Sequence, residues 1–233
     1  DPVSSGMKVS GVSIEYTTVT DPSDIQLEFN LSGEDSDGDE ISTDFEVTLM
    51  SGTSGNDNIS TGLSDDSVSG GEGNDTIDAG DGTDIVDGGA GNDIIVYDSN
   101  DTSIDGGADN DTLVLPDVND AIDFSSIGDL ANTPTNQSIT NIENLDLTAT
   151  GSQSVSNLTL ADVVDMTENS GKVLKITGDS INDPSGDSVE LDGTGVWTQS
   201  ATTQTVDSVN YNVYTNSEDA TYKVLIQTDI INV

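Results

Sequence analysis

Aspartate recurs at intervals of nine residues between positions 52 and 114, and this spacing has the clearest chemical consequence in the sequence. Each aspartate is the sixth residue of a nine-residue unit, which usually opens with glycine and has an aliphatic residue at place eight. Six of the seven units have it, namely Asp57, Asp66, Asp75, Asp84, Asp93 and Asp111. Stacked carboxylates repel one another, and a hard divalent cation that binds carboxylate and carbonyl oxygens, above all Ca²⁺, would remove that repulsion.

The aliphatic residue at place eight is the other constant of the repeat. It is kept in all seven units, as Ile59, Val68, Ile77, Val86, Ile95, Ile104 and Leu113. The sixth unit, 97–105, has lost its glycines and has Thr102 at place six, yet it keeps Ile104. We therefore interpret place eight as a packing position and place six as a ligand position.

The repeat predicts an all-β fold with a parallel β-roll at its centre. Glycine, asparagine and aspartate at places one to six favour turns, and places seven to nine allow only a brief strand. Units two apart would stack directly, at the ~4.8 Å spacing of neighbouring strands. One edge would then have Asp57, Asp75, Asp93 and Asp111, and the other Asp66, Asp84 and Thr102. We expect about three calcium sites on the first edge and one or two on the second, with magnesium fitting less well.

Composition excludes several classes of function. The chain has 45 acidic residues, four lysines and no arginine, and its formal net charge is −41. Nucleic acid is therefore not expected as a partner, because its phosphates require a basic surface. Histidine and cysteine are absent, which excludes Ser-His-Asp and Cys-His catalysis and His-ligated zinc. We expect no catalytic residues and no enzymatic activity.

Charge and cysteine content also bear on stability. High net charge and low hydrophobicity favour disorder until cations bind. In a chain without disulfides, bound metal ions are the available means of stabilising the fold. No apolar run is long enough to form a membrane-spanning helix. Because the sequence begins with Asp1, we expect it to be part of a longer chain, and we expect a monomer.

The flanks divide the chain into three predicted parts, 1–50, 51–115 and 116–233. The first is β-rich, with alternating apolar residues at 7–17, 25–29 and 45–49. Between the last two segments, Asp35, Asp37 and Asp39 form either an extra calcium loop or a solvated hairpin turn.

The third part, 116–233, has a different composition. It predicts strands at 142–147, 173–176, 188–191 and 196–198, and a closing hairpin of 209–214 and 221–227. Thr159 and Asp162 form a capping pair for a short helix, and Gly171 is a plausible stop. This part contains Trp197, Tyr211, Tyr214 and Tyr222, and it would cover the open end of the roll.

The nonapeptide over 52–114 resembles the RTX repeats of proteins exported by type I secretion systems. The C-terminal part is similar to the terminal domain of large RTX adhesins, in the segments Asn141–Thr148 and Leu158–Thr167, in Trp197 and Tyr211–Tyr214, and in the tail 229–233. The tail departs from a purely aliphatic end at Asn232. Residues 1–50 resemble the last extender-type β-sandwich of such an adhesin.

This resemblance implies calcium ligands of three kinds. Besides the place-six aspartates, it implies the place-five side chains of Asn56, Asp65, Asn74, Asn92 and Asn110. It also implies backbone carbonyls of Gly52, Ser54, Gly55, Gly70, Gly71, Glu72, Gly73, Gly80, Gly82, Gly88, Gly89, Ala90, Gly91, Gly107 and Asp109. The family pattern fails at Thr102, and Thr83 is a weak place-five substitute. In total we expect about four to six ions.

The function that the resemblance implies is calcium-dependent folding coupled to export. The repeats would stay unfolded at cytosolic calcium, pass the type I secretion apparatus with the C-terminal signal, and fold on binding calcium at the bacterial surface or in the medium. Two alternatives remain open. One is a module that binds a surface or a glycan, and the other is a non-catalytic appendage of an exported enzyme.

Overall fold

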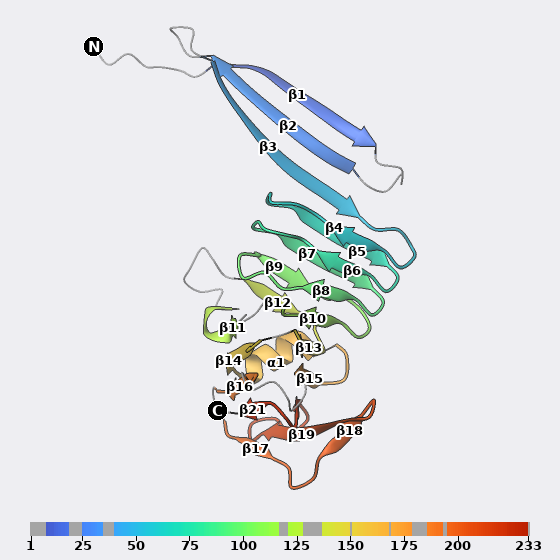
Figure 1. Cartoon of the computed structure of the whole chain (residues 1–233), viewed down its shortest axis with the longest axis vertical. Coiled ribbons are helices and arrows are strands. Elements are labelled where there is room, and N and C mark those ends of the chain that lie inside the picture. Colours follow the sequence, from blue (N-terminus) through green and yellow to red (C-terminus); the bar gives the residue numbers. More distant parts are fainter. Residues whose placement is uncertain are drawn as a thin grey trace, which may run out of the picture.

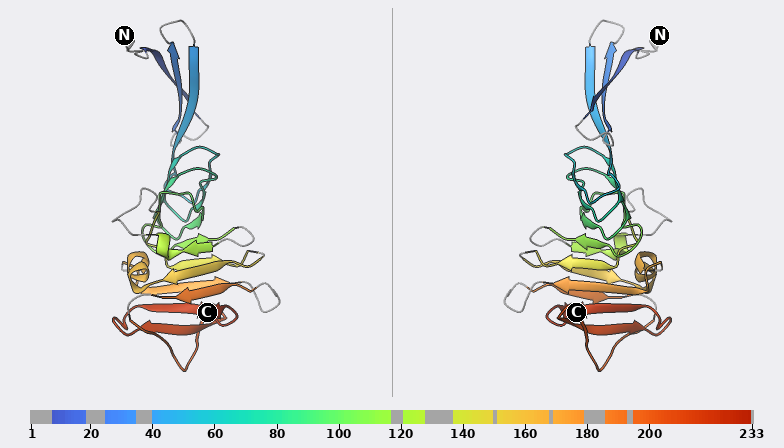
Figure 2. Two further views of the ribbon diagram at one scale, coloured as in Figure 1. Left: turned by 90° about the vertical axis from the view of Figure 1, so that its left-hand side faces the viewer. Right: turned by 90° about the vertical axis from the view of Figure 1, so that its right-hand side faces the viewer.

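The computed structural model of this chain is an elongated stack of short β-strands (Figure 1). The structure describes residues 8–18, 25–34, 40–116, 121–127, 137–149, 151–167, 169–178, 186–192 and 195–232. The predicted calcium loop of Asp35, Asp37 and Asp39 lies outside the described residues. Figure 2 shows from two sides that the described parts follow one another along the long axis.

The repeat forms a roll of parallel strands in two sheets. The first sheet contains β5 (Ser67–Glu72), β7 (Ile85–Ala90) and β9 (Ser103–Asp105). The second contains β4 (Asn58–Ser60), β6 (Thr76–Asp78), β8 (Ile94–Val96) and β10 (Thr112–Val114). Successive units alternate between the sheets, so Ile59 pairs with Ile77 and Val68 with Val86. The predicted β-roll with units two apart in register is therefore confirmed.

Two strands of the first sheet, β5 and β7, are longer than the sequence predicts. β5 and β7 each have six residues and continue through places one to three, where Gly71 pairs with Gly89 and Glu72 with Ala90. The assignment of these places to the turn is wrong for the two units, because their backbones stay in register past the glycine pair. β4, β6, β8, β9 and β10 keep the expected three residues.

One inward residue per strand fills the interior of the roll. The place-eight side chains of Ile77, Ile95, Ile104 and Leu113 are 0% exposed, and Ile59 at the end of the second sheet is 7% exposed. Ile85 and Ile94, one residue earlier in their strands, are 50% and 43% exposed because successive side chains of a strand point to opposite faces. Place eight is thus the packing position, as predicted. The sixth unit keeps an aliphatic residue there because Ile104 fills the interior of the roll.

The N-terminal strands extend the first sheet. β1 (Lys8–Thr18), β2 (Ile25–Glu34) and β3 (Glu40–Ser51) form an antiparallel meander. The end of β3 then pairs in parallel with β5, with Met50 opposite Val68. The transition from antiparallel to parallel pairing therefore occurs within one continuous sheet.

The C-terminal part continues the parallel coil beyond the last nonapeptide. β12 (Ser138–Thr140) adds to the first sheet beside β9, and β13 (Asn144–Leu147), β15 (Val173–Gly178) and β20 (Lys223–Gln227) add in turn to the second sheet. β11 (Ala121–Asp123), β14 (Ser154–Leu158), β16 (Ser188–Leu191) and β21 (Ile231–Asn232) form a third parallel sheet. The period of nine does not predict this continuation, because these coils have different lengths.

The helix α1 (Leu160–Thr167) packs against β12, the last strand of the first sheet, and against β15. A short 3₁₀ helix, η1 (Phe124–Ser126), follows β11. The backbone N–H of Thr159 donates to Asp162 Oδ2 at 2.8 Å, which is the predicted capping pair. At the other end of α1, the carbonyl of Met166 accepts the N–H of Ile142, two residues after β12, at 2.9 Å. The helix thus closes the coil beneath β12 through its own terminal carbonyls.

An antiparallel hairpin ends the stack. β19 (Val209–Asn216) pairs with β20, and β17 (Trp197–Gln199) and β18 (Gln204–Val206) pair with β19. Figure 1 shows β17, β18 and β19 at the end of the stack. Tyr214 and Tyr222 lie in the core. Across the described ranges, α1 is too short to cross a bilayer, and no other helix is a candidate span.

Candidate calcium sites

The place-six aspartates of the first edge form a ladder with the backbone of the neighbouring units. The N–H of Asp57 donates to Asp75 Oδ1 at 2.8 Å, and the N–H of Asp75 donates to Asp93 Oδ1 at 2.7 Å. The N–H of Asp93 donates in the same way to Asp111 Oδ1 at 2.8 Å. One oxygen of each acceptor carboxylate is thus used to hold the coil together, and the second is left for another partner.

The ladder of the first edge ends on a residue that the repeat does not predict. The N–H of Asp111 donates to Glu143 Oε2 at 2.7 Å, and the hydroxyl of Ser170 donates to Glu143 Oε1. Glu143 is 4% exposed. Both of its oxygens have protein partners, so it terminates the column of aspartates. It lies 32 residues from Asp111 rather than 18, which is why a search for the period misses it.

The second edge has a ladder of its own, and its third member is Asp101 rather than Thr102. The N–H of Asp66 donates to Asp84 Oδ1 at 2.7 Å, and the N–H of Asp84 donates to Asp101 Oδ1 at 3.2 Å. Asp101 is 2% exposed, whereas Thr102 is exposed. The interpretation of the sixth unit as defective at place six is wrong, because a shift of one residue brings a neighbouring aspartate into the column.

The second carboxylate oxygen of these aspartates is buried without a protein partner. This holds for Oδ2 of Asp75, Asp84, Asp93, Asp101 and Asp111. A buried polar atom without a hydrogen bond costs roughly 1–3 kcal/mol, and more if it is charged. Since four of these aspartates have place six and Asp101 takes the equivalent position in its column, the repeat fits a positive ligand that binds oxygen. A hard cation such as Ca²⁺ meets that requirement.

The glycines at place one leave room for that ligand. A Cβ atom on Gly88 would lie 2.4 Å from Gly106 O and 2.7 Å from Asp93 Oδ2. On Gly70 it would lie 2.3 Å from Gly88 O and 2.5 Å from Asp75 Oδ2. A side chain at place one would therefore fill the space where a carbonyl oxygen and the unpartnered carboxylate oxygen come together.

Backbone carbonyls would have to supply most of the remaining ligands. Among the described residues, no group of three or more acidic side chains is arranged to hold a metal ion. The turns do present their carbonyls in a repeated way, since Gly71 and Gly89 have φ of 101° and Gly73 and Gly91 have φ of 131° and 129°. Asp109 replaces the glycine of place four at φ 84°, a conformation that aspartate tolerates better than most residues. The individual carbonyl ligands stay a prediction.

The place-five side chains lie on the outside and form a second ladder that runs in the opposite direction. The N–H of Asn74 donates to Asn56 Oδ1 at 2.9 Å, that of Asn92 to Asn74 Oδ1 at 2.7 Å, and that of Asn110 to Asn92 Oδ1 at 3.1 Å. Thr83 N–H donates to Asp65 Oδ1 at 2.9 Å. These oxygens therefore stabilise the stacking of units, and their predicted role as calcium ligands stays a prediction.

Burial perturbs the ionisation of the column. Without a cation, burial, together with the neighbouring carboxylates and against an opposing backbone hydrogen bond, raises the pKa of Asp111 and of Asp101 from 3.8 to about 7. Burial likewise raises the pKa of Asp75, Asp84 and Asp93. The folded column therefore takes up protons more readily than the unfolded chain does.

Acid should partly replace calcium in stabilising the roll. Between about pH 4 and pH 7 the cation-free folded state binds more protons than the unfolded state, so the free energy of unfolding falls as pH rises through this window. We expect calcium-depleted protein to have more β-structure at pH 5 than at pH 7.5 by circular dichroism. Less β-structure at pH 5 than at pH 7.5 would contradict the raised pKa of the buried aspartates.

Comparison with known families agrees with the geometry. Residues 51–86 and 61–95 match the RTX calcium-binding nonapeptide repeat family, in four copies. No curated protein matches the chain. The matched residues contain β4 to β7, the first two residues of β8, and the aspartates from Asp57 to Asp93. This segment is an RTX repeat, and calcium is the cation that such repeats bind.

Proposed function

We propose that this RTX repeat protein is a calcium-dependent folding and export module at the C-terminal end of a large bacterial adhesin. It would be unfolded at the low calcium of the cytosol, pass a type I secretion apparatus, and fold on binding calcium outside the cell. Its place of action would be the cell surface or the medium, and its role would be non-catalytic.

The observation that carries this proposal is the row of buried carboxylate oxygens without a protein partner. Asp75, Asp93 and Asp111 are each at most 1% exposed, and each leaves Oδ2 unpartnered. At neutral pH the roll needs a counter-ion to bury these carboxylates in their charged form, and the unfolded chain has no such column. Binding free energy is therefore folding free energy. Extracellular calcium sites have Kd of about 10⁻⁴–10⁻³ M, which lies far above cytosolic calcium.

The C-terminal part favours a structural role over ligand binding. It extends both sheets of the roll, and its last described strand, β21, pairs with β16 beside the terminal residues. Tyr211, Tyr214 and Tyr222 are 3–6% exposed. These aromatic side chains pack the interior, so they do not offer the surface that a glycan-binding module would need. The alternative of an appendage of an exported enzyme would have the same roll. It would differ from the proposed adhesin module only in the domains that precede the roll.

A titration with free calcium tests the coupling directly. We expect a cooperative gain of β-structure by circular dichroism with a midpoint of about 10⁻⁴–10⁻³ M calcium, and no such gain with magnesium over the same range. Calorimetry on the same samples should give several bound ions. A calcium-depleted protein that is already folded at neutral pH, or an equal response to magnesium, would overturn the proposal.

A further inference from the structure

The three N-terminal strands form a single layer that no other described element covers. β2 pairs with β1 and β3 along its whole length, and the end of β3 pairs with β5. Among the described elements, none besides these neighbours has more than marginal contact with the meander of β1, β2 and β3. Figures 1 and 2 show it projecting from the roll as one sheet. A sheet of three strands needs an apolar face packed against something else to be stable, so its two faces have different roles.

The register divides the meander into an apolar face and an acidic face. Residues two apart on a strand lie on the same face, and so do paired residues of neighbouring strands. One face therefore has four rows, namely Val12, Leu31 and Thr43; Ile14, Phe29 and Phe45; Tyr16, Leu27 and Val47; and Thr18, Ile25 and Leu49. The opposite face has Glu15, Glu28 and Glu46 in one row and Asp44 in the next. The four rows contain no charged residue, and we refer to them as the apolar face of the meander.

The apolar face of the meander lies on the outer side of the first sheet. At the junction Met50 pairs with Val68, which is 2% exposed inside the roll, whereas Leu49 pairs with Ser67 and Ser67 with Ile85. Because Leu49 belongs to the apolar face, this face continues into the row of Ile85, which is 50% exposed. The acidic face continues instead into the interior of the roll. The roll is thus on the opposite side of the sheet and cannot cover the apolar face.

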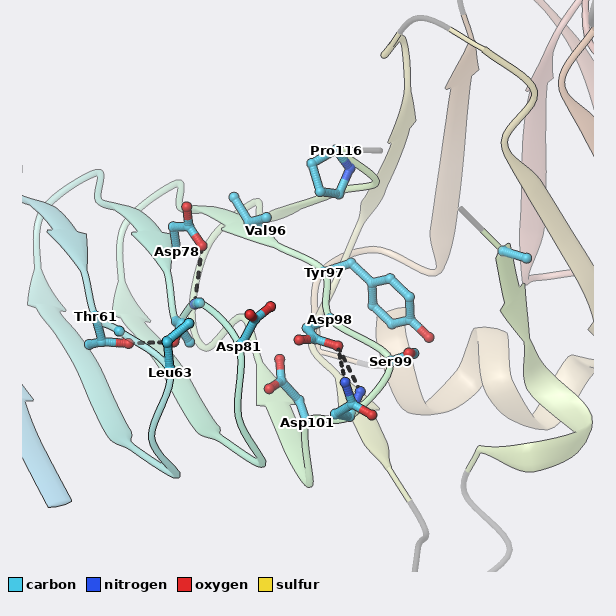
Figure 3. A pocket seen from close by; sticks show the side chains of 15 residues that line it. Thr61, Leu63, Asp78, Asp81, Val96, Tyr97, Asp98, Ser99, Asp101 and Pro116 are labelled. Carbon is cyan, nitrogen blue, oxygen red and sulfur yellow. Dashed lines mark hydrogen bonds between the residues drawn. The ribbon is translucent and has the colours of Figure 1, made fainter. Parts of the chain in front are cut away.

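Charge opposes contact between two copies at the edges of the roll. The net charge of the chain is −41, and no lysine or arginine occurs in residues 52–114. Figure 3 shows Asp78, Asp81 and Asp98 around the hollow of about 700 Å³ on the second edge. Two such surfaces would repel each other. The apolar face has no charged position, so two copies can meet there without this repulsion.

The size of the apolar face fits a dimer interface. Three strands about 4.8 Å apart, each with about seven residues of about 3.3 Å, cover roughly 14 by 23 Å. Two such faces would together bury roughly 1,000 Å² of accessible surface, which is the size from which a specific interface is expected. Face-to-face packing of two antiparallel sheets is also the ordinary way in which such sheets bury their apolar faces.

We propose that the apolar face of the meander is the interface of a homodimer, in which the same face of a second copy completes a six-stranded β-sandwich. The interface is self-complementary under a two-fold axis, because each copy supplies the same uncharged rows. The dimer takes the place of the monomer that we expect from the sequence, and it joins two rolls in one particle. It goes beyond the proposed function and does not depend on export.

Analytical ultracentrifugation of the whole chain at saturating calcium tests the interface. We expect a species of twice 24.1 kDa that dissociates on dilution. Phe29→Glu places a charge on the middle strand at the centre of the apolar face, and it should raise the dissociation constant by about 100-fold or more. Gln26→Glu adds the same charge to the same strand on the acidic face and should change the dissociation constant by less than about threefold. A mass of 24.1 kDa at every concentration of the unmodified chain would overturn the proposal.

A second pair of variants covers the case in which Phe29→Glu does not fold. Tyr16→Glu adds a charge to the apolar face on the edge strand β1, and Thr17→Glu adds the same charge to the next residue, on the acidic face. Circular dichroism and the number of bound calcium ions should be equal in these two variants. Only Tyr16→Glu should dissociate into monomers, and equal dissociation constants for the two variants would overturn the proposal.

Binding of an apolar dye separates a second copy from any other occupant of the face. The dimer should bind little anilinonaphthalene sulfonate, and monomeric Tyr16→Glu should bind more. A monomeric unmodified chain that binds the dye would show that the face is open to a different partner, and the dimer would be refuted. If the chain forms dimers but binds no calcium, the proposed function is refuted and the interface stands. If calcium folds a chain that stays monomeric, only the interface is refuted.

Discussion

Replacing Asp93 with asparagine should raise the calcium concentration needed for folding by about tenfold or more, equivalent to about 1.4 kcal/mol. Asp93 lies in the middle of the first edge, is 1% exposed, and has an unpartnered Oδ2. Asparagine keeps an acceptor for the N–H of Asp75, so the substitution removes charge and leaves the ladder intact. Titrations followed by circular dichroism would give the midpoint, and calorimetry the number of ions.

Asp93→Ala should destabilise the roll more than Asp93→Asn. The difference in the free energy of unfolding measures the contribution of the hydrogen bond between Asp75 N–H and Asp93. Alanine also deletes the acceptor of a buried backbone N–H, which costs roughly 1–3 kcal/mol in addition. Urea unfolding at saturating calcium would measure that difference. Glu72→Gln, which removes an equal charge from an exposed position of the roll, is the matched control and should have little effect. Equal calcium midpoints for Asp93→Asn and Glu72→Gln would show that the register of the ligands is wrong.

Gly88→Ala should destabilise the roll by about 1–3 kcal/mol or more, although it adds only one methyl group. That group would lie 2.4 Å from Gly106 O and 2.7 Å from Asp93 Oδ2, and the carbonyl is fixed by the neighbouring coil. The methyl group would also enter the space between two oxygens that a cation would bind. Both effects should appear as a lower midpoint of urea unfolding and a higher calcium requirement.

Gly62→Ala is the control for the cost of losing a glycine. A Cβ atom on Gly62 would have no neighbour within 4 Å, and its φ does not require glycine. The expected change is within about 0.5 kcal/mol, because reduced freedom of the unfolded chain offsets small losses. If Gly62→Ala and Gly88→Ala were equally destabilising, the close approach at place one would not be the cause.

The sequence by itself determines the roll. A period of nine with one aliphatic residue per unit requires units two apart to stack, because no other arrangement buries Ile77, Ile95 and Leu113 in one row. The same period places Asp57, Asp75, Asp93 and Asp111 on one edge, and the absence of basic residues there makes a cation necessary. The helix cap of Thr159 and Asp162 is equally local, since both partners lie within one turn.

Tertiary structure alone decides what happens where the period fails. Asp101 enters the column at a separation of 17 residues from Asp84, and Glu143 ends the other column at 32 residues from Asp111. Neither separation is a multiple of the repeat, so only the folded path of the chain brings these groups together. The continuation of the first sheet through β12 and of the second sheet through β13, β15 and β20 likewise depends on the folded path of the chain. Local spacing fixes contacts between equal units, whereas contacts between unequal coils depend on where the whole backbone can pack.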